Sequence, residues 1–352
     1  MHNPAVSIRE VLFTGPVHPD QRDFHRLARA GTVEGAEGPG AGGGEGFEGF
    51  EAFARRAGES GPDVPVRRLL LARAADGSAA GTASVILPRR ENARMVGVGM
   101  YVLPEYRRRG VARALMVSAV GGMRELGRDI LWVGAVGTGS PGAAVAAAYG
   151  LHPVYSYVRQ VLEIESADRA AWRVARPAGF RLECWTGGAP EALVESYARA
   201  RSAIGGAPRQ RSAFRYPSWT VDRVRAAEAR WHRLGERHVV MAAVRSQTGE
   251  VAALTELSFR GPETRTVDQQ YTAVLPGDRR RGLALWLKGA MMCWLVEHHP
   301  RARLVLTGTA ADNVGMISVN ERIGYRTVGA WTNYEAELAR VEARLAERAA
   351  RP

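Results

Sequence analysis

One short stretch of this 352-residue chain occurs twice. Residues 102–112 read VLPEYRRRGVA and residues 274–284 read VLPGDRRRGLA, so eight of eleven positions are identical at a spacing of 172 residues. A repeat at a fixed spacing indicates copies of one structural unit. The chain is also longer than one ordinary hydrophobic core accommodates. The sequence therefore predicts a fold that is built twice.

Each copy of the repeat joins an apolar run to a helical pattern. The runs at 94–103 and 267–275 have the length and composition of strands. Apolar residues then recur at helical spacing from Val111 in the first copy and from Leu283 in the second. Gly127 is expected to end the first of these two helices.

The order of predicted strands and helices in residues 1–164 begins again at Phe180. The run RPAG interrupts the periodicity between the copies, so we expect a linker at 165–178. The predicted domains are 1–164 and 178–352. Each is expected to be an α/β unit, with a central mixed β-sheet flanked by helices. The amphipathic C-terminal stretch is expected to pack as a helix rather than to bind a membrane or a partner.

Composition excludes several function classes. The formal net charge is +12, but no run of five like charges occurs and aromatic content is 7%, so nucleic-acid binding is not expected. Two distant cysteines exclude a disulfide framework and a cysteine zinc cluster. No His, Asp or Glu cluster has metal-ligand spacing, and we expect no metal. Without a signal-like start or a long apolar run, we expect a cytoplasmic protein and no membrane partner.

The repeated pattern Arg-x-x-Gly-x-Ala is typical of a site that binds an anion. The first turn of a helix has backbone N–H groups without intrahelical acceptors, and the positive end of the helix dipole lies there. A pyrophosphate can lie across these donors, and a glycine lets the backbone come close to it. Neighbouring arginines add charged, forked donors. The alternative is a helix start whose arginines are only solvated.

With these motifs, the sequence resembles the GNAT family (GCN5-related N-acetyltransferases), with two GNAT domains in one chain. The residues that carry the resemblance are VLPEYRRRGVARAL and VLPGDRRRGLALWLK, and NVGMISVNERIGY at 313–325 is similar to the closing helix of the family. The family implies acetyl-CoA, or another acyl-CoA, as co-substrate and an amine as acceptor. By the resemblance, the CoA-binding residues are Val102, Arg107, Arg108, Arg109, Gly110, Val111 and Ala112 in copy one, and Val274, Arg279, Arg280, Arg281, Gly282, Leu283, Ala284, Asn313 and Asn320 in copy two.

The sequence departs from the family at the closing helix. Many members have a tyrosine four residues before the closing glycine, where it protonates the leaving thiolate. Copy two has Asn320 there, and copy one has Ala146, which cannot donate a proton. We therefore expect copy two to catalyse the reaction and copy one to bind CoA structurally or to act as a support. Tyr325 and Tyr149 are nearby hydroxyls that could replace the acid, although a packing role is the alternative for both.

The general base is expected on the strand before the CoA strand. Glu256 interrupts the apolar run VAALTELSF and is expected to face the cleft; simple alternation in a half-exposed strand is the alternative. Asp268 is the second candidate, whereas His298 and His299 lie at the far end of a helix, away from the expected site. No serine stands in a nucleophile pattern, so acetyl transfer to the amine should be direct.

The leading prediction is thus an acyl-CoA-dependent N-acetyltransferase that acts on the amine of a small molecule, an antibiotic or a metabolite. A catalytically silent CoA-binding sensor or scaffold is the alternative, because neither copy has the expected tyrosine. Two fused domains resemble a fused homodimer, so we expect a monomer with pseudo-dimeric tandem domains. The sequence does not identify the acceptor.

Overall fold

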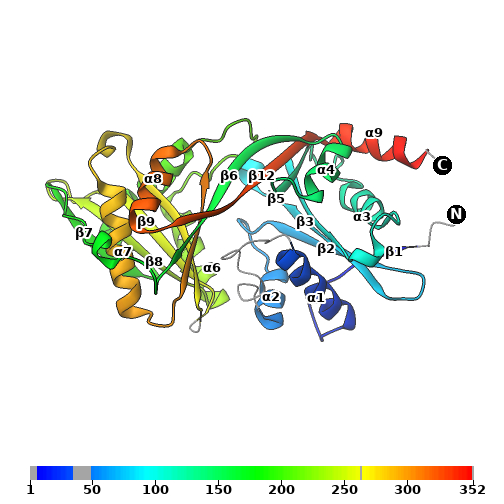
Figure 1. Ribbon diagram of the computed structural model, residues 1–352, viewed down its shortest axis with the longest axis horizontal. Coiled ribbons are helices and arrows are strands. Elements are labelled where there is room, and N and C mark those ends of the chain that lie inside the picture. The colour runs from blue at the N-terminus through cyan, green and yellow to red at the C-terminus, as the bar shows by residue number, and fades with distance from the viewer. Residues whose placement is uncertain (1–5, 35–48, 262–263, 351–352) are drawn as a thin grey trace. The chain divides into compact units, whose positions relative to one another are not determined.

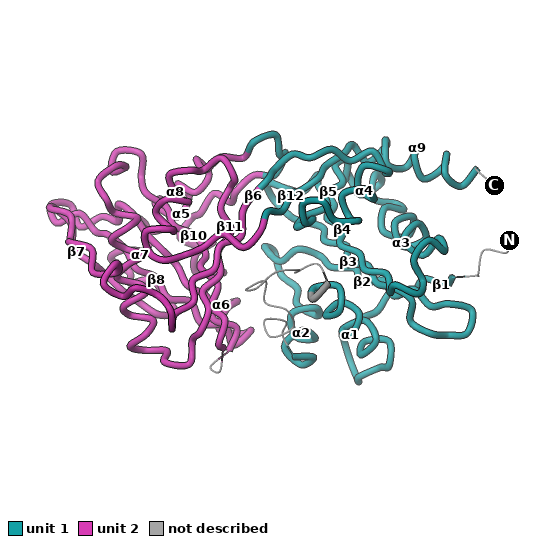
Figure 2. The backbone as a smooth tube through the Cα atoms, in the orientation of Figure 1, with its two compact units in different colours: residues 1–156, 210–214, 330–352 teal, residues 157–209, 215–329 magenta. Residues whose placement is uncertain are grey.

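The computed structural model describes residues 6–34, 49–261 and 264–350. The chain forms two compact units (Figure 2). Unit 1 comprises residues 1–156, 210–214 and 330–352, and unit 2 comprises residues 157–209 and 215–329. Each is an α/β unit with a mixed sheet, as the sequence predicts, and each is described here by itself.

The sheet of unit 1 has the strand order β1-β2-β3-β4-β5-β12. Only the β4–β5 pair is parallel. The strands are β1 (Ser7–Glu10), β2 (Val66–Arg73), β3 (Ala79–Leu87), β4 (Met95–Val102), β5 (Ile130–Gly137) and β12 (Arg326–Glu337). The helices are α1 (Pro19–Glu34), α2 (Phe50–Ala57), α3 (Val111–Val120), α4 (Pro141–Ala148) and α9 (Leu338–Ala349) (Figure 1).

Helices bury both faces of this sheet. On one face, α3 and α9 pack through residues such as Leu115 and Val341. On the other, Phe24 and Leu27 of α1 pack against Leu71 of β2. The C-terminal stretch is therefore a packing helix, as predicted. Helix α3 ends earlier than predicted, at Val120 rather than near Gly127, because two consecutive glycines follow it and the second has a positive φ of 72°.

The sheet of unit 2 has the order β6-β11-β10-β9-β8-β7, and within it only the β10–β11 pair is parallel. The strands are β6 (His152–Glu163), β7 (Phe180–Thr186), β8 (Arg237–Arg245), β9 (Val251–Phe259), β10 (Thr266–Val274) and β11 (Leu304–Ala310). The helices are α5 (Glu191–Ser202), α6 (Val221–Leu234), α7 (Leu283–His298) and α8 (Val314–Ile323).

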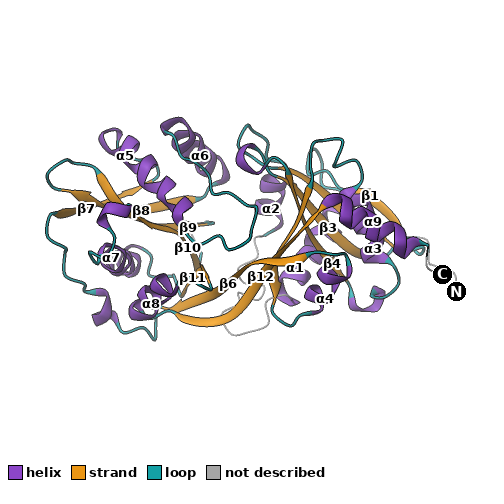
Figure 3. Ribbon diagram, turned by 90° about the horizontal axis from the view of Figure 1, so that it is seen from above, coloured by secondary structure: helices purple, strands orange, loops and turns teal. Residues whose placement is uncertain are grey.

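Strand β9 is buried along its whole length because helices cover both of its faces. Helices α5 and α6 lie on one side of the sheet, and α7 and α8 lie on the other (Figure 3). Leu254 packs in the core beneath α5, with Leu193 and Val240. Leu257, three residues along the strand, packs in the core beneath α7, with Leu287.

The two units exchange strands, so they differ from the predicted stretches 1–164 and 178–352. Strand β6 follows the first copy in sequence but pairs with β11, where Leu162 faces Val305. Strand β12 follows the second copy but pairs with β5, where Trp331 faces Gly137. An unpaired sheet edge is unfavourable, and hydrophobic register rather than order along the chain decides which strand covers it.

The predicted linker is packed against unit 2. Trp172 lies in a short 3-10 helix (Arg169–Trp172), is buried, and donates its indole N–H to the carbonyl of Ile323 at 2.8 Å. A Cβ at Gly289 of α7 would come within 2.4 Å of the Trp172 carbonyl oxygen. This glycine therefore lets the linker backbone lie directly on α7.

Candidate functional site

The two repeated loops have the same backbone conformation. Each follows a 3-10 turn, Pro104–Tyr106 or Pro276–Asp278. The middle arginine of each triplet has a φ of 61°, which is unusual for a residue with a side chain. The glycine that begins the helix also has a positive φ, 81° at Gly110 and 77° at Gly282. The eight shared residues therefore form the same turn in both copies.

In both loops the helix begins with free amides. The first backbone bond of α3 runs from the Ala114 N–H to the Gly110 carbonyl, and that of α7 from the Trp286 N–H to the Gly282 carbonyl, both at 3.0 Å. The amides of the three preceding residues in each helix have no intrahelical acceptor. A diphosphate fits such a set of donors at the positive end of a helix. These loops can therefore hold the CoA diphosphate.

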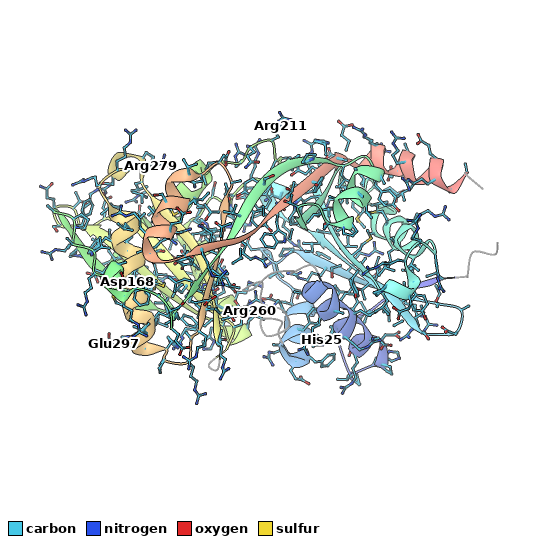
Figure 4. The ribbon with its side chains drawn as sticks, viewed as in Figure 1. His25, Asp168, Arg211, Arg260, Arg279 and Glu297 are labelled. Carbon is cyan, nitrogen blue, oxygen red and sulfur yellow. The ribbon has the colours of Figure 1, made fainter. Side chains whose placement is uncertain are left out.

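The loops differ in where their carboxylate lies. In unit 2, Asp278 is buried beside the triplet and accepts from Arg245 at 2.6 Å and from Arg281 at 3.2 Å. The Arg281 guanidinium also lies 4.5 Å from the centre of the Phe180 ring. Arg279 is exposed, and its label in Figure 4 marks the position of this loop.

In unit 1, as in unit 2, all three arginines of the triplet are exposed, but Tyr106 takes the position of Asp278. The guanidinium of Arg109 lies 5.9 Å from the centre of the Tyr106 ring. The position beside this loop therefore holds a phenol in place of a carboxylate, and the acidic residue of this copy is the exposed Glu105.

The parallel strand pair next to each loop separates after three residue pairs. Strands β4 and β5 pair only from Met95–Ile130 to Gly97–Trp132. Strands β10 and β11 pair only from Thr266–Leu304 to Asp268–Leu306. Beyond these points the facing backbone groups have no partner in the opposite strand, so each opening can accept an extended ligand with amide groups of its own.

Only unit 2 has a bulge in the strand beside this opening. Strand β10 shifts its register against β9 between Gln269 and Thr272, whereas β4 pairs with β3 without a shift. The sequence shows the same difference, because one more residue separates Thr266 from Gly282 than separates Met95 from Gly110. A bulge redirects backbone groups next to active sites, so it can aim an N–H at a reacting carbonyl.

In unit 1, an indole lies where the strands separate. A Cβ at Gly97 of β4 would come within 2.7 Å of the Trp132 ring, and a Cβ at Gly134 of β5 within 2.8 Å. The two glycines therefore let Trp132 lie flat against both strands. This ring takes up space beside the opening in unit 1.

Glu256 is buried rather than open to solvent. It is 1% exposed, and its carboxylate accepts from the Tyr197 hydroxyl at 2.9 Å and from Arg201 Nη2 at 3.1 Å. Burial and the Glu256 carboxylate raise the pKa of Tyr197 well above its ordinary value. The carboxylate is thus part of an ion pair beneath α5, and its role as general base stays a prediction. The second candidate, Asp268, forms an ion pair with Arg260 at 3.3 Å.

Asn320 lies on the opposite side of the sheet, in α8, and is completely buried. Its Nδ2 donates to Gln160 Oε1 at 2.8 Å and to Thr309 Oγ1 at 3.2 Å. Gln160 Nε2 and Asn320 Oδ1 have no hydrogen-bond partner in the described part of the chain. Asn313, which was predicted to bind CoA, uses its Oδ1 to cap α8 by accepting from the Met316 N–H at 3.2 Å.

Tyr325 packs in the core beneath α7, and its hydroxyl has no hydrogen-bond partner within the described residues. Burial raises the pKa of Tyr325 above the range in which a phenol gives up its proton easily. The ammonium of Lys288, the only lysine, lies 5.3 Å from the centre of this ring. Burial lowers the pKa of Lys288 to about 7.

The structure therefore brings Asn320 and Tyr325 together at the end of α8, where the Tyr325 N–H donates to the Asn320 carbonyl at 3.0 Å. It does not bring Glu256 to them. Arg201 and Gln160 were not predicted, because no motif indicates a partner so far away in the chain. Neither a group of metal ligands nor a helix able to span a membrane occurs among the described residues.

The fold of this chain is similar to that of known proteins. Residues 48–149 match the model of the acetyltransferase (GNAT) family. A tandem GNAT protein from the clavulanic acid biosynthesis pathway is similar over 95% of this chain and 99% of its own, with 25% identity and a TM-score of 0.75. A GCN5-related N-acetyltransferase from Sphaerobacter thermophilus shares the fold over 95% of this chain and 96% of its own, with 18% identity and a TM-score of 0.69. No curated protein matches the sequence.

Proposed function

We infer the function of this chain from its tandem GNAT fold and its match to the GNAT acetyltransferases. We propose an acyl-CoA-dependent N-acetyltransferase that moves an acetyl group from acetyl-CoA directly to the amine of a small molecule, an antibiotic or a metabolite. The observation that carries the proposal is the pairing, in each unit, of a loop with free helix-start amides and a parallel strand pair that separates beside it.

The residues of this chain fit acetyl-CoA. The amides of Leu283, Ala284 and Leu285 would hold the diphosphate in unit 2, and Arg279 and Arg280 would add charge. The amides of residues 111–113 and the exposed arginines of the triplet would do the same in unit 1. The co-substrate supplies the activated acetyl group.

We propose that unit 2 catalyses the transfer. Its bulge at 270–271 supports this, because unit 1 has no bulge in the corresponding strand. Trp132 also supports it, because this ring takes up space beside the opening of unit 1. The family match falls on residues 48–149, so unit 1 has the sequence of the family without the bulge. Unit 1 then binds CoA or supports the fold.

Two variants test the assignment. Gly110→Trp and Gly282→Trp each place a large side chain at one loop and leave the other loop intact. CoA binding is measured by calorimetry, and thiol release from acetyl-CoA is measured with a panel of amines. We expect Gly282→Trp to abolish turnover and Gly110→Trp to reduce only the number of CoA molecules bound. The opposite result would assign catalysis to unit 1.

A catalytically silent CoA-binding sensor is the second candidate. It is favoured by Asn320, which replaces the family tyrosine and is buried in a network with Gln160 and Thr309. An amide there is not a proton donor for a leaving thiolate. CoA binding with no thiol release in the presence of any amine would support this candidate over the enzyme.

A further inference from the structure

A buried guanidinium lies beneath α5 in unit 2. Arg201, in the last turn of α5, is 4% exposed. Its Cζ lies 3.6 Å from the centre of the Trp219 ring, and the rings of Trp231 and Tyr271 follow at 5.3 and 5.4 Å. Aromatic rings stabilise a cation in such an arrangement. Arg201 is therefore held by ring faces as well as by a carboxylate.

The Glu256 carboxylate contacts only one edge of this guanidinium. Arg201 Nη2 donates to Glu256 Oε2 at 3.1 Å, and Nε lies 2.9 Å from Oε1. Nε makes only this ion-pair contact, without a hydrogen bond. Nη1 has no hydrogen-bond acceptor in the described chain, and neither has the indole Nε1 of Trp219. These two buried donors on stacked groups therefore lack any partner.

Hydrogen bonds to α5 hold Trp219 in place. Its backbone N–H donates to Ser202 Oγ at 2.7 Å, and Ser202 Oγ donates to the Ala198 carbonyl at 2.9 Å. The indole is thus tied to α5 next to Arg201. Tyr271, which lies against the same guanidinium, belongs to the bulge of β10. The two donors therefore lie beside the strand opening where we propose that transfer occurs.

A buried donor without an acceptor costs about 1–3 kcal/mol, and native structures retain such groups where a ligand or water completes them. Guanidinium and indole N–H groups donate only, so their partner must be a hydrogen-bond acceptor. A carboxylate meets this condition and forms charge-assisted bonds with an arginine. We propose that Arg201 Nη1 and Trp219 Nε1 bind a carboxylate of the acceptor, so that the acceptor is an amine that also carries a carboxylate.

In this arrangement Arg201 and Trp219 are specificity-determining residues, and Glu256 is a positioning residue that holds Arg201. The inference rests on the proposed function, because it names the substrate class of the same site. Its first test does not require turnover. The indole N–H signal of Trp219 in a 1H–15N spectrum is assigned from its absence in Trp219→Phe, which keeps a ring over the guanidinium.

The probes are glycine and 4-aminobutyrate, with propylamine as the matched amine without a carboxylate and inorganic phosphate as the alternative oxyanion. We expect the two amino carboxylates to shift the Trp219 signal to saturation, while propylamine leaves it in place. Arg201→Lys should weaken the response, and Arg199→Lys, a change at an exposed arginine of the same helix, should not. No shift with either carboxylate, or a response to phosphate alone, would overturn the inference.

A kinetic test follows with amino acids and the amines obtained by removing their carboxylate. We expect Trp219→Phe to raise KM about tenfold for the amino acids, with kcat retained, because a missing hydrogen bond to a charged group weakens binding. KM for the matched amines should not change. Equal use of both series by the unaltered protein would contradict the inference. Failure of the proposed function is distinguishable, because it appears as absent CoA binding in calorimetry whatever the Trp219 signal does.

Discussion

The side-chain amide of Asn320 donates a 2.8 Å hydrogen bond to the side chain of Gln160, 160 residues earlier in the chain. Gln160 lies in β6, which the sequence places at the end of the first copy. The bond therefore joins the closing helix of the second copy to β6, a strand from the first copy that completes the sheet of unit 2. Exchange of β6 and β12 makes each unit depend on sequence from both halves.

Removal of residues 330–352 should therefore unfold unit 1, although most of unit 1 lies far earlier in the sequence. This deletion takes away most of β12, which pairs with β5, and α9, whose Leu338, Val341 and Leu345 are buried in unit 1. We expect amide hydrogen exchange in β5 and α3 to become fast, while β9 and β10 of unit 2 keep their protection. Equal loss of protection in both units would contradict the exchange.

Arg280→Gly should stabilise the protein and weaken CoA binding. The φ of 61° at Arg280 is strained for a residue with a side chain, and glycine relieves about 1 kcal/mol of that strain. The lost positive charge should lower CoA affinity several-fold. The control is Arg279→Gly, because Arg279 has an ordinary φ of −64°. This control should lose affinity without gaining thermal stability, and a gain in both variants would argue against strain.

Glu256→Gln should destabilise the protein by about 3–5 kcal/mol, because it leaves the buried Arg201 guanidinium without its charge partner. Burial lowers the pKa of Arg201, but the charge and hydrogen bond of Glu256, together with Tyr197 and Tyr271, raise it above its ordinary value, so Arg201 stays charged in the folded protein. The double variant Arg201→Met with Glu256→Leu should recover most of the loss in urea denaturation. Additive losses would show that the two residues do not act as a pair.

The same Glu256→Gln variant separates the two roles of this residue in catalysis. A general base gives a lower kcat with a changed pH profile. A residue that positions Arg201 gives a raised KM for the acceptor with the pH profile retained. The inference above predicts the second outcome, measured as initial rates across pH 6 to 9 with the best acceptor.

Lys288→Met should stabilise the protein most at neutral and lower pH. Burial lowers the pKa of Lys288 from its ordinary 10.5 to about 7. Below about pH 7 both states hold the proton, and the folded state bears the whole cost of the buried charge. Between pH 7 and 10.5 only the unfolded chain holds it, so the stability of the unaltered protein rises with pH.

The gain from Lys288→Met is therefore expected to be a few kcal/mol at pH 6, since one pKa unit corresponds to about 1.4 kcal/mol. It should shrink towards pH 10. Urea denaturation of both proteins at pH 6, 8 and 10 measures this, and Arg322→Met, a change at an exposed cation of α8, is the control. A gain that does not vary with pH would exclude burial of the charge as its cause.

Local features were predictable from the residues alone. The repeat at residues 102–112 and 274–284 indicated two units, and its glycines indicated a place where an anion could come close to the backbone. The strands before each loop and the helices after it follow from periodicity within a few residues. The similarity to a tandem GNAT protein confirms the doubled α/β architecture. The position of Glu256 under α5 was not predictable, because it depends on Arg201, 55 residues earlier in the chain.

The sequence by itself determined the elements, the doubled architecture and the two repeated loops before α3 and α7, since these depend on neighbours within a helix turn or a strand. Tertiary structure alone decided which strand completes each sheet, that the predicted linker packs on α7, and that Arg201 and Trp219 hold unpaired donors beside the bulge of β10. The physical reason is that register and burial are settled by the competition of distant segments for the same surface, and a linear pattern of residues does not record that competition.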